Sequence, residues 1–403
     1  MAGKLKKTVV FCVLIGLMFG ITLRVKADII RVNEDGSGDY LDIPNAVFDA
    51  NDGDTILVGP GEYTGAYLDN SAAGLKIIGS GLNTRIVRPC YEESEVKYGC
   101  YIAVPDVVIS NLSVELEDVQ SADFVYGIIM KTHPDLDTSA ANSVVENVVV
   151  KSANMGIAAR STENPRIEGN IVVSDSDDRG ILCDYCTNPV IIDNYIAGDY
   201  WACVDVTGST GATIRDNNIA GYYSLGIFLY LSSGTICSNV VSGTGDCGIG
   251  AFSISDCNVT SNIIKNFHCL ATEYWAVPIH LEKSQGCVIN NNALINVFQD
   301  QNDVNENVPI AGIYGYGTLD VPCLNITVQD NDFSKSGLPG WNQDGSGGPG
   351  CISLNEYFTD GLVVIGDDSN LPGDDPNSFP ISKWVQDLGT NNMILWEIDD
   401  DVE

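Results

Sequence analysis

A four-residue pattern that ends in asparagine recurs through the middle of the chain, at steps of mostly 22 to 24 residues. In each copy an apolar residue stands three positions before the asparagine, as in IEGN, IIDN and IRDN. The asparagines are Asn147, Asn170, Asn194, Asn217, Asn239, Asn262 and Asn292, and Asn111 and Asn331 extend the series at longer steps. A repeat of this length indicates stacked units, none of which buries an apolar face alone.

A second element keeps step with the first. A short run that begins near a glycine or another small residue precedes each asparagine, as in MGIAAR, RGILCD and LGIFLY. Helical periodicity is missing, and runs such as VVENVVV and GNIVV favour β-branched residues. Leucine-rich repeats have a similar length, but their LxxLxLxxN pattern and helical half are absent. The sequence therefore predicts an all-β, right-handed parallel β-helix, with each coil about 4.8 Å above the last.

The repeated asparagine has a structural explanation within this fold. Asparagine tolerates left-handed backbone geometry at turns, and stacked side-chain amides form hydrogen-bonded ladders. We expect each repeat asparagine to lie at a turn, in the left-handed conformation, bonded to the asparagine one coil away.

The stretch DGSGDYLDIPNAVFDANDGDTILVGPGEY, residues 35–63, predicts a cap for the first coil. An open solenoid end would attract further strands and needs a cover. Ile43, Ala46, Val47 and Ala50 fall on one face of a short helix that suits this role. We expect residues 54–58 to form the first strand, followed by the turn Gly59-Pro60-Gly61.

The two ends of the chain differ from the repeat region. Residues 1–27 have a basic start, an apolar run and a small residue at Ala27, as signal peptides do; a retained membrane anchor is the alternative. We expect the β-helix to span residues 28–366. Residues 367–403 read as an acidic linker and a second cap. The mature chain is predicted to be secreted, periplasmic or on the cell surface.

The charge of the chain limits its partners. The full sequence carries 20 basic and 54 acidic residues; without the five basic residues of 1–27 the net charge is −39. A chain this acidic repels nucleic acid and anionic membranes. No later segment is apolar enough to span a bilayer, and we expect a monomer.

Twelve cysteines follow the predicted signal peptide, an even number that permits disulfides in an exported chain. Only Cys183 and Cys186 have CxxC spacing, without a second pair or a nearby histidine, which argues against zinc. Apolar packing remains the alternative to disulfides. Repeat register favours Cys257 with Cys287, and Cys90 with Cys100 across a local loop.

Three stretches, DGSGDYLDIPNAV, GDTILVGPGEY and LKIIGSGLNTRIV, resemble the entry to pectin lyase-like β-helix proteins, the first being most similar to pectin methylesterases. The resemblance implies the right-handed β-helix over roughly residues 29–366. The chain lacks the GHG and NTD of polygalacturonases, the WIDH of pectate lyases, the GRPW and GTVDFIFG of pectin methylesterases and the DPHE of mannuronan epimerases. The resemblance therefore implies no catalytic residue.

Alignment of the coils predicts which side chains leave the core. In each glycine-isoleucine run the first and third residues after the small one are apolar and should face inward. The second and fourth should face solvent. Aromatic rings in or just before these positions suit stacking on sugar rings; burial under loops or a protein contact is the alternative. The predicted substrate-binding residues are Phe228, Tyr230, Phe252, Tyr200, Trp201, Tyr222, Tyr223 and Trp275.

Carboxylates on the same face are the candidates for catalysis. Asp184 and Asp205 lie on adjacent coils two strand positions apart, which favours a separation of about 5 to 9 Å as in glycoside hydrolases. Arg160 stacks beside Asp184, where it would hold a uronate or lower the pKa of that carboxyl group. His280 is the best-placed base, with Glu282 beside it. Solvated surface charge is the alternative for the aspartates.

Calcium is the one cofactor that the sequence suggests. Asp177, Asp178 and Asp199 cluster near one predicted turn, with Asp175 and Asp205, and carboxylate oxygens suit Ca²⁺. No EF-hand loop or GGxGxD repeat is present, so solubilising charge is the alternative.

These features predict an extracellular protein that binds a polysaccharide, with uronic acids as candidate sugars, and that acts as a hydrolase or lyase. The rival prediction is a β-helix without catalysis that serves as a surface adhesin or structural scaffold. Missing catalytic motifs favour the rival; the aromatic face with its aspartates favours the enzyme.

Overall fold

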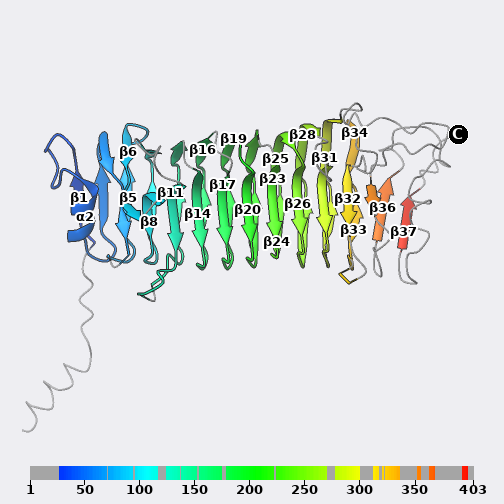
Figure 1. The fold of residues 1–403 in the computed structure, drawn as a ribbon, viewed down its shortest axis with the longest axis horizontal. Helices are drawn as coiled ribbons and strands as arrows, with labels where there is room; N and C mark the ends of the chain where they lie inside the picture. The colour runs from blue at the N-terminus through cyan, green and yellow to red at the C-terminus, as the bar shows by residue number, and fades with distance from the viewer. Residues whose placement is uncertain are drawn as a thin grey trace, which may run out of the picture.

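Short strands stack into one long solenoid with three faces (Figure 1). The computed structural model describes residues 27–335 apart from 70, 94–95, 117–123, 137, 152–153, 175–177, 222–223, 270–276, 300–311, 317–319 and 322, and beyond them residues 352–354, 363–367 and 393–397. The predicted signal peptide lies outside the described residues. None of the described helical residues forms a segment long and apolar enough to cross a membrane.

Three parallel sheets run along the solenoid, and in its middle part each coil gives one strand to each sheet. Sheet A contains β1 (Ile29–Val32), β2 (Thr55–Val58), β5 (Lys76–Gly79), β9 (Val108–Ser110), β12 (Val144–Glu146), β15 (Arg166–Glu168), β18 (Val190–Ile192), β21 (Ala212–Arg215), β24 (Gly234–Cys237), β27 (Cys257–Thr260), β30 (Val288–Asn290), β33 (Thr327–Gln329), β36 (Val363–Asp367) and β37 (Met393–Glu397). Sheet B contains β3 (Gly61–Thr64), β6 (Thr84–Arg88), β10 (Ser113–Glu115), β13 (Val149–Lys151), β16 (Ile171–Ser174), β19 (Tyr195–Gly198), β22 (Asn218–Ala220), β25 (Val240–Gly245), β28 (Ile263–Cys269), β31 (Ala293–Gln299) and β34 (Asp332–Lys335).

Sheet C carries the candidate site. It contains β4 (Tyr67–Leu68), β8 (Val96–Ile102), β11 (Phe124–Lys131), β14 (Met155–Arg160), β17 (Arg179–Asp184), β20 (Ala202–Thr207), β23 (Leu225–Tyr230), β26 (Cys247–Phe252), β29 (Val277–Glu282), β32 (Ile313–Tyr316) and β35 (Ile352–Leu354), and β7 (Tyr91–Glu93) pairs antiparallel with β8. The right-handed parallel β-helix predicted from the repeat is confirmed.

The N-terminal end is closed by the predicted helix. Helix α2 (Ile43–Asp49) buries Ile43, Ala46 and Val47 against the first coils, and Asp42 caps it by accepting a hydrogen bond from the Asn45 backbone N–H at 2.9 Å. The prediction that residues 54–58 form the first strand is wrong, because β1 precedes β2 and pairs with it. At the other end β37 adds a strand to sheet A, within the segment expected to form the second cap.

Buried asparagines form a continuous ladder inside the solenoid. Each side chain donates from Nδ2 to Oδ1 of the next asparagine at 2.9 to 3.0 Å, through Asn170, Asn194, Asn217, Asn239, Asn262, Asn292 and Asn331. The predicted ladder is confirmed, but the predicted left-handed conformation is wrong. That conformation belongs to the preceding residue, such as Asp193 or Asp216.

Asn111 and Asn147 do not belong to this ladder. Both have positive φ, 56° and 53°, so they occupy the left-handed position, and the buried Leu112 and Val148 follow in the ladder position. The Val148 backbone N–H donates to Oδ1 of Asn170 at 2.9 Å, which begins the ladder. The sequence pattern is therefore displaced by one residue at the first two asparagines of the series, Asn111 and Asn147.

A second buried row runs along the turn that follows sheet C. Ser209, Ser232 and Ser284 each donate from Oγ to a backbone carbonyl of the preceding coil. Cys186 takes the same position and donates from Sγ to the Ala159 carbonyl at 3.3 Å. The Cys186 backbone N–H donates to Ser209 Oγ at 2.9 Å. One half of the CxxC pair thus replaces a serine.

The predicted disulfides are not confirmed. No disulfide joins the cysteines whose side chains the structure describes, which are Cys90, Cys100, Cys183, Cys186, Cys203, Cys237, Cys247, Cys257, Cys287 and Cys323. Most are buried, and burial raises the pKa of several of these thiols, as at Cys100, to about 11.

Candidate functional site

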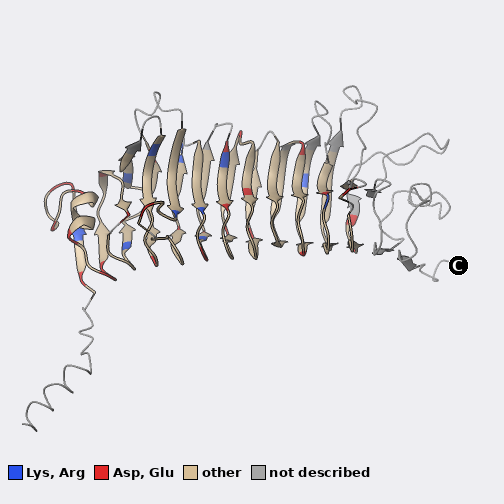
Figure 2. Ribbon diagram, turned by 60° about the horizontal axis from the view of Figure 1, so that its bottom comes forward, with Lys and Arg blue, Asp and Glu red and all other residues tan. Residues whose placement is uncertain are grey.

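The outer face of sheet C carries two apolar clusters. Side chains alternate along each strand, so residues that leave the core project from this face. The cluster nearer the N-terminus contains Tyr98, Tyr101, Ala103, Tyr126, Ile129, Met155, Ala158 and Leu182. The cluster nearer the C-terminus contains Ala202, Leu225, Phe228, Cys247, Val277 and Tyr314. Figure 2 shows Lys and Arg in blue and Asp and Glu in red at positions along the whole solenoid, on a ribbon that is mostly tan.

Five charged side chains and one threonine occupy the gap between these clusters. We call them the polar band: Arg160, Asp178, Arg179, Asp184, Asp205 and Thr207. They come from β14, β17 and β20 and the residue before β17, and the strand register places Arg160, Asp184 and Thr207 in one row. The band contains three of the five predicted catalytic residues.

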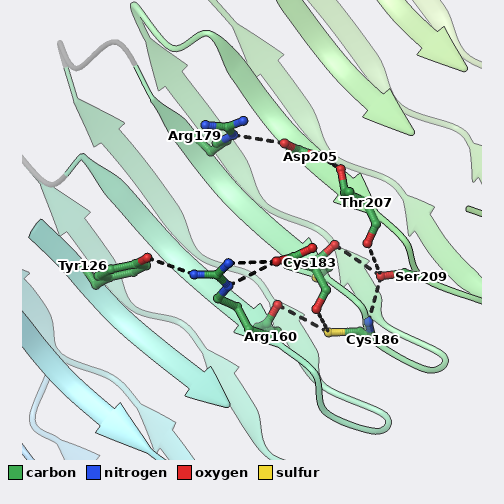
Figure 3. Close-up of polar contacts among 10 residues, drawn as sticks. Tyr126, Arg160, Arg179, Cys183, Cys186, Asp205, Thr207 and Ser209 are labelled. Carbon is green, nitrogen blue, oxygen red and sulfur yellow. Dashed lines mark hydrogen bonds and ion pairs between the residues drawn. The ribbon is translucent and has the colours of Figure 1, made fainter. Parts of the chain in front are cut away.

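Arg160 and Asp184 form the more exposed half of the polar band, and Figure 3 shows Arg160 pointing toward Tyr126. Arg160 donates from Nη2 and Nε to Asp184 Oδ2, at 2.9 and 3.2 Å. Its Nη1 also donates to the Tyr126 hydroxyl at 3.4 Å. The Arg160 side chain is 45% exposed and that of Asp184 14%. An arginine this open retains donors for a bound anion.

Asp205 forms the buried half, and both of its oxygens are bonded. Arg179 donates from Nε to Oδ2 at 3.0 Å, and Thr207 donates from Oγ1 to Oδ1 at 2.7 Å. Arg179 also pairs with Asp178 at 2.6 Å and lies 4.6 Å from the centre of the Trp201 ring. Burial nevertheless raises the pKa of Asp205, because desolvation of the carboxylate outweighs the two donors.

The prediction that the second residue after each small one faces solvent is wrong. Asp205 is 2% exposed, Phe228 9% and His280 0%. These side chains do leave the core, but neighbours on the same face pack on them: Trp201 and Phe252 on Phe228, Phe252 on His280, and Arg179 on Asp205. Coils are so close that bulky side chains on one coil shield the next.

His280 therefore does not suit the predicted role of a base. Its ring packs against Phe252 and Tyr314, with centroids 4.6 and 5.2 Å apart, and Nδ1 lies 3.8 Å from Cys247 Sγ. Burial lowers its pKa to about 3, so the ring stays neutral. Glu282 pairs with Lys283 at 2.6 Å, three strands away from Asp205, and is not brought to the polar band.

Only part of the predicted aromatic surface is exposed. Tyr230 is 39% exposed, whereas Tyr200 is fully buried and Trp201 and Phe252 pack against the C-terminal cluster. Tyr222, Tyr223 and Trp275 lie outside the described residues. Sequence alignment missed Tyr185, which is 65% exposed at the turn directly after Asp184. The signal that could have identified Tyr185 is its position in the sequence, directly after the candidate carboxylate Asp184.

The predicted calcium ligands do not converge in the described part of the chain. Asp178 is bonded to Arg179, Asp199 is exposed, and Asp177 lies outside the described residues. Among the residues that the structure describes, no group of three or more His, Cys, Asp or Glu side chains has an arrangement that would hold a metal ion.

Two family models match the sequence. Residues 49–243 match the model described as "Periplasmic copper-binding protein (NosD)", and residues 203–333 match "Right handed beta helix region". No protein with a curated description matches. The first description names copper, but the described residues contain no group of three or more His, Cys, Asp or Glu side chains arranged to hold a metal ion.

Solved structures resemble the chain in fold. The Dettilon tailspike protein is 13% identical with a TM-score of 0.54 over 80% of this chain; the chain spans 62% of the tailspike's length. DFA-IIIase from Arthrobacter chlorophenolicus A6, in complex with GF2, is 12% identical with a TM-score of 0.50, covering 80% of this chain and 86% of that one. The A-module of the Azotobacter vinelandii mannuronan C-5 epimerase AlgE4 is 14% identical with a TM-score of 0.48, covering 87% and 93%.

Proposed function

We propose that this right-handed parallel β-helix binds a polysaccharide outside the cytoplasm, at the polar band on sheet C. The Arg160–Asp184 pair, in which the arginine side chain is 45% exposed, carries this proposal. DFA-IIIase, solved in complex with GF2, lends support as a protein of similar fold. The periplasmic description of the matching family model supports the location.

The chemistry of the pair suits a sugar that bears a carboxylate. The Arg160 guanidinium is a planar donor that binds carboxylates in a bidentate manner. Asp184 accepts hydrogen bonds and would receive them from sugar hydroxyls. Together they offer one donor group and one acceptor group on an open surface. A polyuronate is therefore the favoured ligand, despite the acidic charge of the chain.

Cleavage of the polysaccharide is the second candidate function. A raised pKa suits Asp205 to donate a proton, as the acid of a hydrolase does, and Asp184 would be its partner carboxylate. The burial of Asp205 and its bonds to Arg179 and Thr207 favour binding without catalysis instead. The adhesin or scaffold role thus remains the rival to an enzyme.

Binding of the exported protein to polygalacturonate, alginate and dextran, with and without Ca²⁺, tests the proposal. Arg160→Gln and Asp184→Asn should weaken binding to the uronates. Arg215→Gln is the matched control, because Arg215 forms an exposed ion pair with Asp216 away from sheet C. Equal binding by all three variants would reject the polar band.

Product analysis separates the candidate functions. A hydrolase releases new reducing ends alone, whereas a lyase also forms an unsaturated uronate that absorbs in the ultraviolet. An Asp184→Asn, Asp205→Asn double variant should lose either activity by orders of magnitude. Binding without any product supports the scaffold role.

A further inference from the structure

We propose that the Tyr185 ring is a stacking platform for one sugar ring of the polysaccharide at the polar band; this inference rests on the proposed function. Tyr185 follows Asp184 directly and is 65% exposed, more than Tyr230. Sugar rings present C–H faces that pack on aromatic rings. A sugar on Tyr185 would lie beside the carboxylate that Arg160 binds.

The turn after sheet C makes a tyrosine at this position unexpected. The equivalent residues in neighbouring coils are Ser161, Gly208, Leu231, Ser253 and Lys283, and the first four donate a hydrogen bond from the backbone N–H to the following coil. All have positive φ, as does Tyr185 at 52°. Because all of these turns adopt this conformation, the conformation does not explain why a tyrosine stands at position 185. Bulky side chains are disfavoured there.

Gly208 holds the ring in place. A Cβ atom at Gly208 would lie 2.6 Å from Cδ1 and 2.7 Å from Cε1 of Tyr185, closer than side chains approach. One side of the ring therefore rests on the backbone of the next coil, and the remainder is open. A ring that is already fixed loses little conformational entropy when a ligand binds.

Exposed apolar side chains continue along the same edge. Leu231, two coils beyond Tyr185 in the same turn position, is 54% exposed, and Tyr230 precedes it. An extended chain of sugars that crosses coils would contact these residues in order. The shape and the aromatic rings suit a polysaccharide better than a compact ligand.

Affinity electrophoresis in gels that contain polygalacturonate tests the platform. Tyr185→Ala should weaken binding about three- to tenfold, and Tyr185→Phe should retain it because the ring is kept. Gly208→Ala should also weaken binding, because the new Cβ displaces the ring without removing it. Tyr195→Ala is the control, since Tyr195 is 40% exposed on sheet B.

The outcomes separate this inference from the proposed function. Wild-type affinity in Tyr185→Ala, together with weakened binding in Arg160→Gln, overturns the platform and leaves the polar band. Binding lost equally in Tyr195→Ala overturns it as well. Failure of the wild-type protein to bind any of the three polysaccharides overturns both proposals. Melting curves show whether Gly208→Ala folds, and Tyr185→Ala provides the test if it does not.

Discussion

Arg179 Nε lies 3.0 Å from Asp205 Oδ2, and the pKa of Asp205 is raised despite this contact. The carboxylate is almost completely buried, so loss of hydration costs more than its two hydrogen bonds return. The Asp205 carboxyl group therefore keeps its proton to a higher pH than a carboxyl group in water.

Asp205→Asn should change how stability depends on pH. The pKa of Asp205 is higher in the folded state than in the unfolded state, so the folded state binds the proton more tightly. Proton binding to Asp205 therefore stabilises the protein fully below the unfolded pKa of 3.8, and this stabilisation is lost as pH rises through the folded pKa. The free energy of unfolding of the variant should improve relative to wild type between pH 3.5 and 7. Urea titrations at several pH values check this, with Asp216→Asn as the control. A difference in the free energy of unfolding between Asp205→Asn and wild type that does not change with pH contradicts the prediction.

His280→Phe should act in the opposite direction. The folded pKa of His280 is about 3, so wild-type stability from this residue is present above 6.5 and is lost as pH falls. From pH 6.5 to 4.5 the wild type should lose roughly 2 to 3 kcal/mol that the variant retains. Thermal or urea unfolding at both pH values measures this loss. Equal losses in both proteins would show that His280 titrates normally.

Asn217→Ala should destabilise the protein much more than Asn218→Ala, although the residues are neighbours. Oδ1 of Asn217 accepts two hydrogen bonds from Asn194, which alanine leaves unpaired inside the solenoid. The expected cost is about 3 kcal/mol in the free energy of unfolding. Asn218 is exposed and should cost little. Similar values for the two variants would mean that the ladder contributes nothing specific.

Phe228→Ala should reduce stability, and Tyr230→Ala should affect mainly ligand binding. Phe228 packs edge-on against Trp201 and Phe252 at 5.5 and 5.2 Å, so alanine leaves a cavity that costs about 2 to 4 kcal/mol. Tyr230 is 39% exposed and fills no comparable space. Denaturation and polysaccharide binding, measured on both variants, separate the roles. A stable Phe228→Ala that no longer binds would restore Phe228 to the binding surface.

The repeat predicted the fold because stacking imposes the same demand on every coil. Ile157 and Ile181 pair across adjacent strands and both face the core, so a single alignment places them correctly. The same reasoning failed at Asn147, since a left-handed turn accepts asparagine as readily as the ladder does. Asparagine suits both the left-handed turn position and the ladder position, so the repeat spacing alone does not show which position a given asparagine occupies.

The candidate site was predicted only in part, for a different reason. Alternation along a strand correctly directs Asp205 and His280 out of the core, but it does not state what lies over them. His280 is covered by Phe252 and Tyr314 from the neighbouring coils, and Asp205 is paired with Arg179 of the preceding coil. The exposure of Tyr185 likewise depends on Gly208, a coil away. Such contacts between coils do not follow from the pattern within one repeat.

The asparagine ladder keeps neighbouring coils at a constant spacing, however many residues each coil contains. Consecutive asparagines are 22 to 39 residues apart, yet their side-chain bonds stay between 2.9 and 3.0 Å. Extra residues are therefore accommodated outside the ladder, without changing the register of the next coil. Evolution, or an engineer, can lengthen a loop beside sheet C and alter what it recognises while the scaffold keeps its pitch.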